Sequence, residues 1–139
     1  MQLYLIRHGQ STNNALWDAS HSEVGRVVDP ALTALGRQQA IAAGAYLAAS
    51  NGPSGNSECD PQNRTGFGLT HLYCSFMDRA INTGLEISRA VGLPLVAWTE
   101  AHEGGGLYAV DATSGAVVGV PGGQSRILCN TLPGARAAG

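Results

Sequence analysis

Charge is scarce in this sequence. Only 13% of its 139 residues are charged, the net charge is −2, and the 8 basic residues form no run. A nucleic-acid-binding surface needs clustered basic residues, so the composition argues against that class of partner. No apolar stretch approaches the roughly 20 residues that span a membrane, and no basic region followed by an apolar segment marks a secretory signal. We therefore expect a cytoplasmic protein that binds neither nucleic acid nor a membrane.

Cysteine and nucleotide-binding motifs are also scarce. Cys59, Cys74 and Cys129 are odd in number, widely spaced and without a CxxC pair. This spacing favours free thiols in a reducing compartment over a disulfide framework or a zinc site. Neither GxxxxGK[ST] nor GxGxxG occurs, which disfavours a nucleotide-binding module.

The length fits one domain covering residues 1–139, and 44% hydrophobic content is enough for a real core. Short apolar runs alternate with longer helical patterns along the chain. We expect strands at 3–6, 69–74 and 94–98, and helices at 34–49 and 78–91. Alternating strands and helices predict an α/β fold, with a mainly parallel sheet and helices on both faces.

Both predicted helices carry local signals at their ends. Thr33 is a natural N-cap for the first, Asp78 can cap the second, and Gly92 ends it. The expected buried positions are apolar residues at helical spacing. They are Leu35, Ala42, Ala43, Tyr46 and Leu47 in the first helix, and Ile81, Leu85, Ile87 and Val91 in the second.

The remaining segments are expected to be loops or short strands. Residues 15–31 lack periodicity and predict a long loop with at most a short helix, while the Gly-, Asn-, Pro- and Ser-rich segment 51–68 predicts a surface insertion. Two apolar runs at 107–110 and 116–120 can pair as a hairpin. Residues 121–139 predict an irregular tail.

The first predicted strand is followed by Arg7, His8 and Gly9. Ligand crevices of open α/β sheets lie beyond the carboxyl ends of strands, and glycine turns a chain sharply at little steric cost. Arginine binds phosphoryl oxygens in pairs, and a neutral imidazole can attack phosphorus. The triplet alone would fit a solvated turn equally well, so its interpretation depends on other segments.

Those segments resemble one known family. Asn14 follows Arg7 by seven positions, and in the segment that begins at Asp29, Leu32-Thr33, Gly36 and Gln39-Ala40 match an Asp-x-Pro-Leu-Thr-x-x-Gly-x-x-Gln-Ala pattern. Residues 75–83 are similar to Ser-Pro-x-x-Arg-Ala-x-x-Thr, with Phe76 in place of the proline. The segment from Trp98 to Gly105 resembles Trp-x-x-x-His-Glu-x-Gly. Together these motifs resemble the histidine phosphatase superfamily, also called phosphoglycerate mutase-like.

The resemblance implies a three-layer sandwich and a phosphomonoester hydrolase that forms a phosphohistidine on His8. Arg7, Arg79 and Asn14 would hold the phosphoryl oxygens, and Arg79 would add its charge to a helix N-terminus. In isolation, Arg79 would more simply pair with Asp78 or Glu86 on a helix surface. The implied acid is Glu103, with Glu100 left open, and Gly9 and Gln10 complete the expected substrate contacts. The expected partner is a small phosphorylated substrate, and no metal or cofactor is required.

One family feature is missing. The family has a second catalytic histidine in a late His-Gly motif, and none of His8, His21, His71 and His102 fits that position. We therefore expect a truncated member that lacks the C-terminal part of the fold. Loss of one preorganised donor typically lowers rates about 10²–10³-fold, so we expect impaired activity. An uncovered sheet edge would favour self-association or weak stability. Mutase-type phosphoryl transfer, or an impaired pseudoenzyme that only binds phosphate, remain the alternatives.

Overall fold

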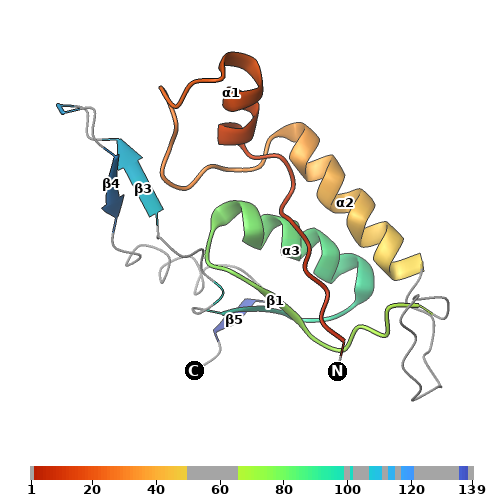
Figure 1. Cartoon of the computed structure of the whole chain (residues 1–139). Helices are drawn as coiled ribbons and strands as arrows, with labels where there is room; N and C mark the ends of the chain where they lie inside the picture. The colour runs from red at the N-terminus through yellow and green to blue at the C-terminus, as the bar shows by residue number, and fades with distance from the viewer. Residues whose placement is uncertain are drawn as a thin grey trace.

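The computed structural model describes residues 2–49, 66–98, 101, 107–110, 113–114, 117–120 and 135–137. In these residues three helices and five strands follow one another along the chain (Figure 1). The helices are α1 (Thr12–Ser20), α2 (Ala34–Ala49) and α3 (Asp78–Val91). The strands are β1 (Leu72–Cys74), β2 (Leu95–Ala97), β3 (Leu107–Val110), β4 (Val117–Val120) and β5 (Ala135–Ala137).

The principal sheet has the strand order β1-β2-β5, and its adjacent strands are parallel. Strand β1 pairs Leu72 with Leu95 of β2, and β2 in turn pairs Leu95 with Ala135 of β5. The predicted strands at 69–74 and 94–98 are thus confirmed in shortened form. Strand β5 lies in the segment that we predicted to be an irregular tail, so that prediction is wrong at 135–137.

Helix α3 covers this sheet. Its buried side chains include Ile81 and Ile87, and Gly84 lies directly against the Leu95 side chain of β2. Gly92 ends the helix with a φ of 72°, as predicted, because glycine adopts this left-handed conformation without a Cβ penalty. The prediction of Asp78 as N-cap is wrong: Met77 is the N-cap residue and supplies no side-chain hydrogen bond.

Helix α2 packs on α3 through small residues. A Cβ on Gly44 would lie 3.0 Å from the Glu86 carbonyl oxygen of α3, so the two backbones approach closely. The buried residues are Gly36, Ala40, Gly44 and Leu47. Of the predicted apolar face only Leu47 is buried, while Leu35 and Tyr46 are exposed. Close packing selected the face with the smallest side chains rather than the most apolar face.

The predicted buried strand at 3–6 is wrong. No strand is assigned there, and Leu3 and Leu5 are 76% and 89% exposed. The apolar run indicated a tendency for burial, but a strand also needs a neighbouring backbone to satisfy its N–H and C=O groups. Figure 1 shows the chain from the N-terminus running past α3 and α2 to the start of α1.

The other local predictions have mixed outcomes. Helix α1 is a short helix of 9 residues that begins before the predicted loop and covers its first part, while residues 21–33 are largely irregular, as predicted. Strands β3 and β4 pair antiparallel, which confirms the predicted hairpin. The predicted insertion at 51–68 lies outside the described residues except for 66–68.

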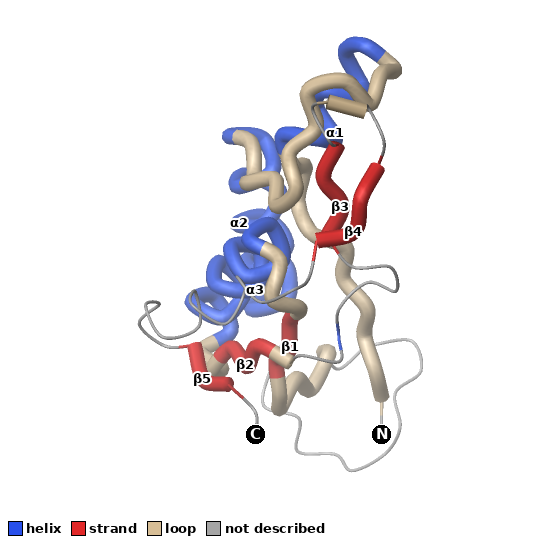
Figure 2. Tube along the Cα trace, turned by 90° about the vertical axis from the view of Figure 1, so that its left-hand side faces the viewer, coloured by secondary structure: helices blue, strands red, loops and turns tan. Residues whose placement is uncertain are grey.

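The described elements are those of an α/β protein. Both α2 and α3 lie on the same side of the β1-β2-β5 sheet, with α3 nearer to it (Figures 1 and 2). The three-layer sandwich with helices on both faces stays a prediction. Among the described helices, none combines the length and the apolar character needed to cross a membrane.

Candidate active site

The backbone around Gly9 is held against two helices. Its N–H donates to Thr83 Oγ1 of α3 at 3.1 Å, and a Cβ at Gly9 would lie 2.2 Å from the Gly36 carbonyl oxygen at the start of α2. Gly9 is not among the glycines with positive φ. The sequence-based reason for glycine here, a sharp turn, is therefore wrong; close approach of two backbones requires it.

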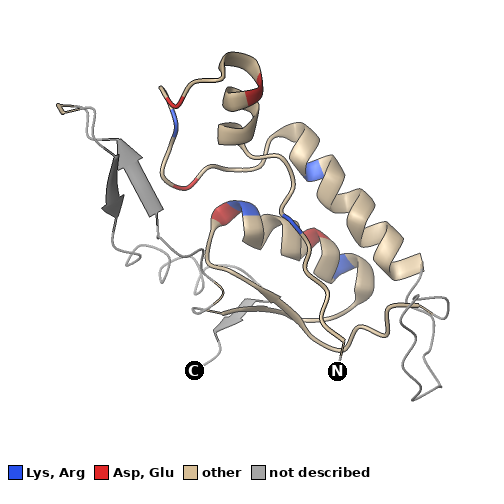
Figure 3. Ribbon diagram, viewed as in Figure 1, with Lys and Arg blue, Asp and Glu red and all other residues tan. Residues whose placement is uncertain are grey.

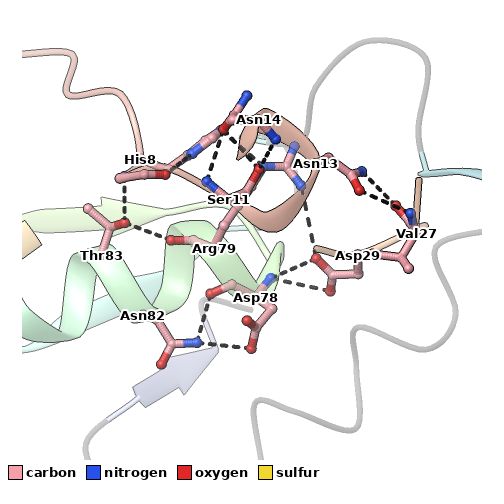
Figure 4. A network of polar contacts seen from close by, with 11 residues as sticks. His8, Ser11, Asn13, Asn14, Val27, Asp29, Asp78, Arg79, Asn82 and Thr83 are labelled. Atoms are coloured by element: carbon pink, nitrogen blue, oxygen red, sulfur yellow. Dashed lines mark hydrogen bonds and ion pairs between the residues drawn. The ribbon is translucent and has the colours of Figure 1, made fainter. Parts of the chain in front are cut away.

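This contact fixes His8, the residue before Gly9, in a defined orientation. His8 Nδ1 lies 2.7 Å from the Gly9 carbonyl oxygen, and Arg79 Nε lies 3.0 Å from His8 Nε2 (Figure 4). A carbonyl oxygen only accepts, so Nδ1 carries the hydrogen and donates it. The Arg79 Nε–H must donate, so Nε2 carries the lone pair. Both partners thus assign the neutral Nδ1–H form with Nε2 as the basic, nucleophilic atom.

Arg79 reaches His8 from the second position of α3. Arg79 is only 9% exposed, so its guanidinium is largely withdrawn from water. Its Nη1 lies 4.0 Å from Asp29 Oδ1, and Glu86 instead pairs with Arg89 at 2.8 Å. Arg79 is therefore directed into the His8 site and not paired with Glu86 on the outer surface of the helix.

Asp29 and Asp78 lie beside this pair at the N-terminal end of α3, where Figure 3 marks adjacent acidic and basic residues. Both oxygens of Asp29 accept from the backbone N–H of Asp78, at 3.0 and 3.2 Å. Burial raises the pKa of the Asp78 carboxyl, the neighbouring Asp29 charge raises it further, and a hydrogen bond from Asn82 opposes both effects. The site therefore contains a carboxyl that ionises less readily than a free aspartate.

The loop carrying Asp29 is attached to α1 by Asn13. The Asn13 amide donates to the Val27 carbonyl oxygen at 2.8 Å and accepts from the Val27 N–H at 3.0 Å. A side chain thus makes the pair of hydrogen bonds that a neighbouring strand would make. The loop is therefore anchored to α1 at Val27, two residues before Asp29.

The other predicted site residues that the structure describes have the following positions. Asn14 Oδ1 accepts from the Ser11 N–H and hydroxyl in a capping box at the start of α1, which leaves its amide NH₂ without a partner among the described residues. The Gln10 side chain is bonded to Thr33 and Asp18. Arg7 is exposed and forms no hydrogen bond or ion pair with a described residue. Glu100 and Glu103 lie outside the described residues.

Sequence reasoning brought His8, Gly9 and Arg79 together but missed two residues that hold them. Thr83 is the last residue of the motif at 75–83, and the motif suggested no role for it. In the structure its hydroxyl accepts from the Gly9 N–H and donates to the Arg79 carbonyl oxygen at 2.7 Å. Asp29 was not predicted to belong to the site. Its position just before Pro30 and Leu32-Thr33 was the available signal.

Comparison with known proteins agrees with the sequence motifs. The family model described as histidine phosphatase superfamily (branch 1) matches residues 3–54. The resemblance found in the motifs is therefore confirmed over that segment, which includes His8 and Asn14. No curated protein and no solved structure matches the chain.

Proposed function

We propose that this protein transfers a phosphoryl group from a small phosphomonoester to His8, and then to water. One observation carries the proposal. Arg79 Nε approaches His8 Nε2 to 3.0 Å across 71 residues of sequence, while His8 Nδ1 is fixed on the Gly9 carbonyl oxygen. The imidazole is thus supported in the form that a nucleophile needs, with a cation beside it for the phosphoryl charge.

The first step forms a bond between His8 Nε2 and phosphorus and breaks the bond from phosphorus to the ester oxygen. Arg79 neutralises charge on the phosphoryl oxygens, and Arg7 and the amide of Asn14 are proposed to bind further oxygens. The departing oxygen takes a proton from an acid, for which Glu103 and Glu100 remain the candidates. Water then gives a proton to the same carboxylate as its oxygen attacks phosphorus, the phosphorus–nitrogen bond breaks with its electron pair returning to His8 Nε2, and inorganic phosphate leaves.

The resting contact between Arg79 and His8 must open during this cycle. The Nε–H that now donates to His8 Nε2 has to turn toward a phosphoryl oxygen before the lone pair can attack. Substrate binding would therefore exchange one charge-assisted hydrogen bond for a stronger one to a dianion.

Labelling with radioactive acetyl phosphate tests the proposal directly. We expect an acid-labile, alkali-stable label on the wild-type protein, and none on His8→Gln. His71→Gln is the matched control, because His71 is exposed, its Nδ1 pairs with the neighbouring Thr70 hydroxyl, and its ring stacks on Tyr73. Release of inorganic phosphate from p-nitrophenyl phosphate should show the same dependence on His8.

The outcomes separate the alternatives. Label followed by phosphate release supports hydrolysis. Label that passes to an added alcohol and not to water identifies mutase-type transfer and overturns the hydrolase. Binding of inorganic phosphate without any label identifies a non-catalytic phosphate-binding domain and overturns the enzymatic proposal altogether.

A further inference from the structure

Helix α3 is capped by a residue from a distant part of the chain. Its own N-cap, Met77, has no side-chain acceptor for the exposed N–H groups of the first turn. The Asp29 carboxylate supplies it instead, accepting from the Asp78 N–H across 49 residues of sequence. The same carboxylate faces Arg79 Nη1 at 4.0 Å. One side chain thus binds both the start of the helix and the guanidinium that the helix presents.

We propose that Asp29 is a positioning residue, which holds Arg79 in the orientation that in turn orients the His8 imidazole. This inference rests on the proposed function and identifies a residue that acts through another. The connection is physical and continuous. Asp29 faces Arg79 Nη1, and Arg79 Nε donates to His8 Nε2 at 3.0 Å. Asp29 therefore influences His8 through the guanidinium that lies between them.

The charge of Asp29 matters because Arg79 is largely buried. A guanidinium withdrawn from water needs an anion or acceptors around it, and a carboxylate opposite Nη1 favours the rotamer that points Nε at His8. With Asp29 neutral, this preference weakens. With Asp29 truncated, the first turn of α3 loses its remote cap as well. Small displacements of catalytic groups are costly, because about 1 Å can reduce a rate 10²-fold.

The loop is anchored on both sides of Asp29. Asn13 is buried and makes two hydrogen bonds to Val27, two residues before Asp29. Pro30, directly after Asp29, is buried and has a fixed φ. Asp29 is therefore held on both sides by rigid backbone, as a positioning residue requires.

Two variants test the role at different strengths. Asp29→Asn keeps an oxygen that can accept from the Asp78 N–H but removes the charge facing Arg79, whereas Asp29→Ala removes both. Glu23→Gln is the matched control. It removes an exposed carboxylate from the same loop, and that carboxylate pairs with Arg26 and not with Arg79. We expect the rate of phosphohistidine formation to fall about tenfold in Asp29→Asn and about 100-fold in Asp29→Ala, with Glu23→Gln unchanged.

A second readout does not depend on activity. Nitrogen NMR of the imidazole, assigned with His8→Gln, reports which ring nitrogen of His8 carries the hydrogen. We expect a fixed Nδ1–H form in the wild type and in Glu23→Gln, and a mixture of both forms in Asp29→Asn.

Unchanged His8 signals and an unchanged rate in a folded Asp29→Asn protein would overturn the positioning role, as would a loss of stability alone. If the wild type shows no phosphohistidine at all, the proposed function fails, yet the His8 signals still decide whether Asp29 orients the pair.

Discussion

The backbones at Gly9 and Gly36 pack directly against each other, so a Cβ added to either glycine would overlap the backbone of the other segment. A Cβ added to Gly9 would lie 2.2 Å from the Gly36 carbonyl oxygen, and one added to Gly36 would lie 2.0 Å from the Gln10 carbonyl oxygen. Neither oxygen can move freely, since each belongs to the backbone. The segment carrying His8 therefore crosses the start of α2 at a distance that only glycine allows at both positions.

Gly9→Ala and Gly36→Ala should each destabilise the protein by about 1–3 kcal/mol or more, because backbone must move to admit the methyl group. Gly92→Ala is the control: its Cβ would meet nothing within 4 Å, and only its φ of 72° is unfavourable. That variant should lose about 1 kcal/mol. Urea unfolding measures all three. Equal losses in the three variants would contradict the close crossing of the two backbones.

Arg79→Lys should lower the rate of phosphohistidine formation about 10²–10³-fold, because lysine keeps the charge but has no Nε–H fork to share between His8 and a phosphoryl group. Arg89→Lys is the matched control on the same helix, where an exposed arginine pairs with Glu86. A rate for Arg79→Lys within about twofold of the control would show that charge alone is sufficient.

Thr83→Val should destabilise the protein by about 1–3 kcal/mol, since the buried Gly9 N–H loses its acceptor. Thr83→Ser keeps the hydroxyl and should restore most of the stability. Thermal unfolding of the two variants provides the comparison, and a valine variant as stable as the wild type would show that the Gly9 N–H does not depend on the Thr83 hydroxyl.

Asp78→Asn should become more stable relative to the wild type as the pH rises above about 3.8, the ordinary pKa of the group. Burial and the Asp29 charge raise the pKa of Asp78 in the folded state. The folded protein then binds more protons than the unfolded chain just above that pH, so wild-type stability falls with rising pH through this interval. Denaturant titrations from acidic to neutral pH measure the difference. A difference that does not change with pH would refute the shift.

Local signals predicted the helices well. Thr33 caps α2, with its hydroxyl accepting from the Gly36 N–H at 3.0 Å, and Gly92 ends α3. The start of α1 has a signal of the same kind, the reciprocal hydrogen bonds of Ser11 and Asn14, although we did not predict a helix that begins at Thr12. Neither strand β5 nor the exposed state of residues 3–6 could be predicted from the sequence, because strand formation depends on partners that are distant in sequence.

For the candidate site, residue types identified the chemistry but not the support around it. Arg79 next to His8 was expected from the motifs, and this contact is present. The remote cap from Asp29 depends on how the loop folds back from Asn13, which no spacing rule contains. The roles of Arg7, Asn14, Gln10, Glu100 and Glu103 stay predictions.

The remote cap has a consequence for local unfolding. The Asp78 amide is protected by a carboxylate from another segment rather than by its own helix. Its hydrogen-exchange rate should therefore follow the opening of the loop around Asp29, while amides deeper in α3 follow unfolding of the whole domain. A single backbone proton would thus record how often the loop leaves the helix.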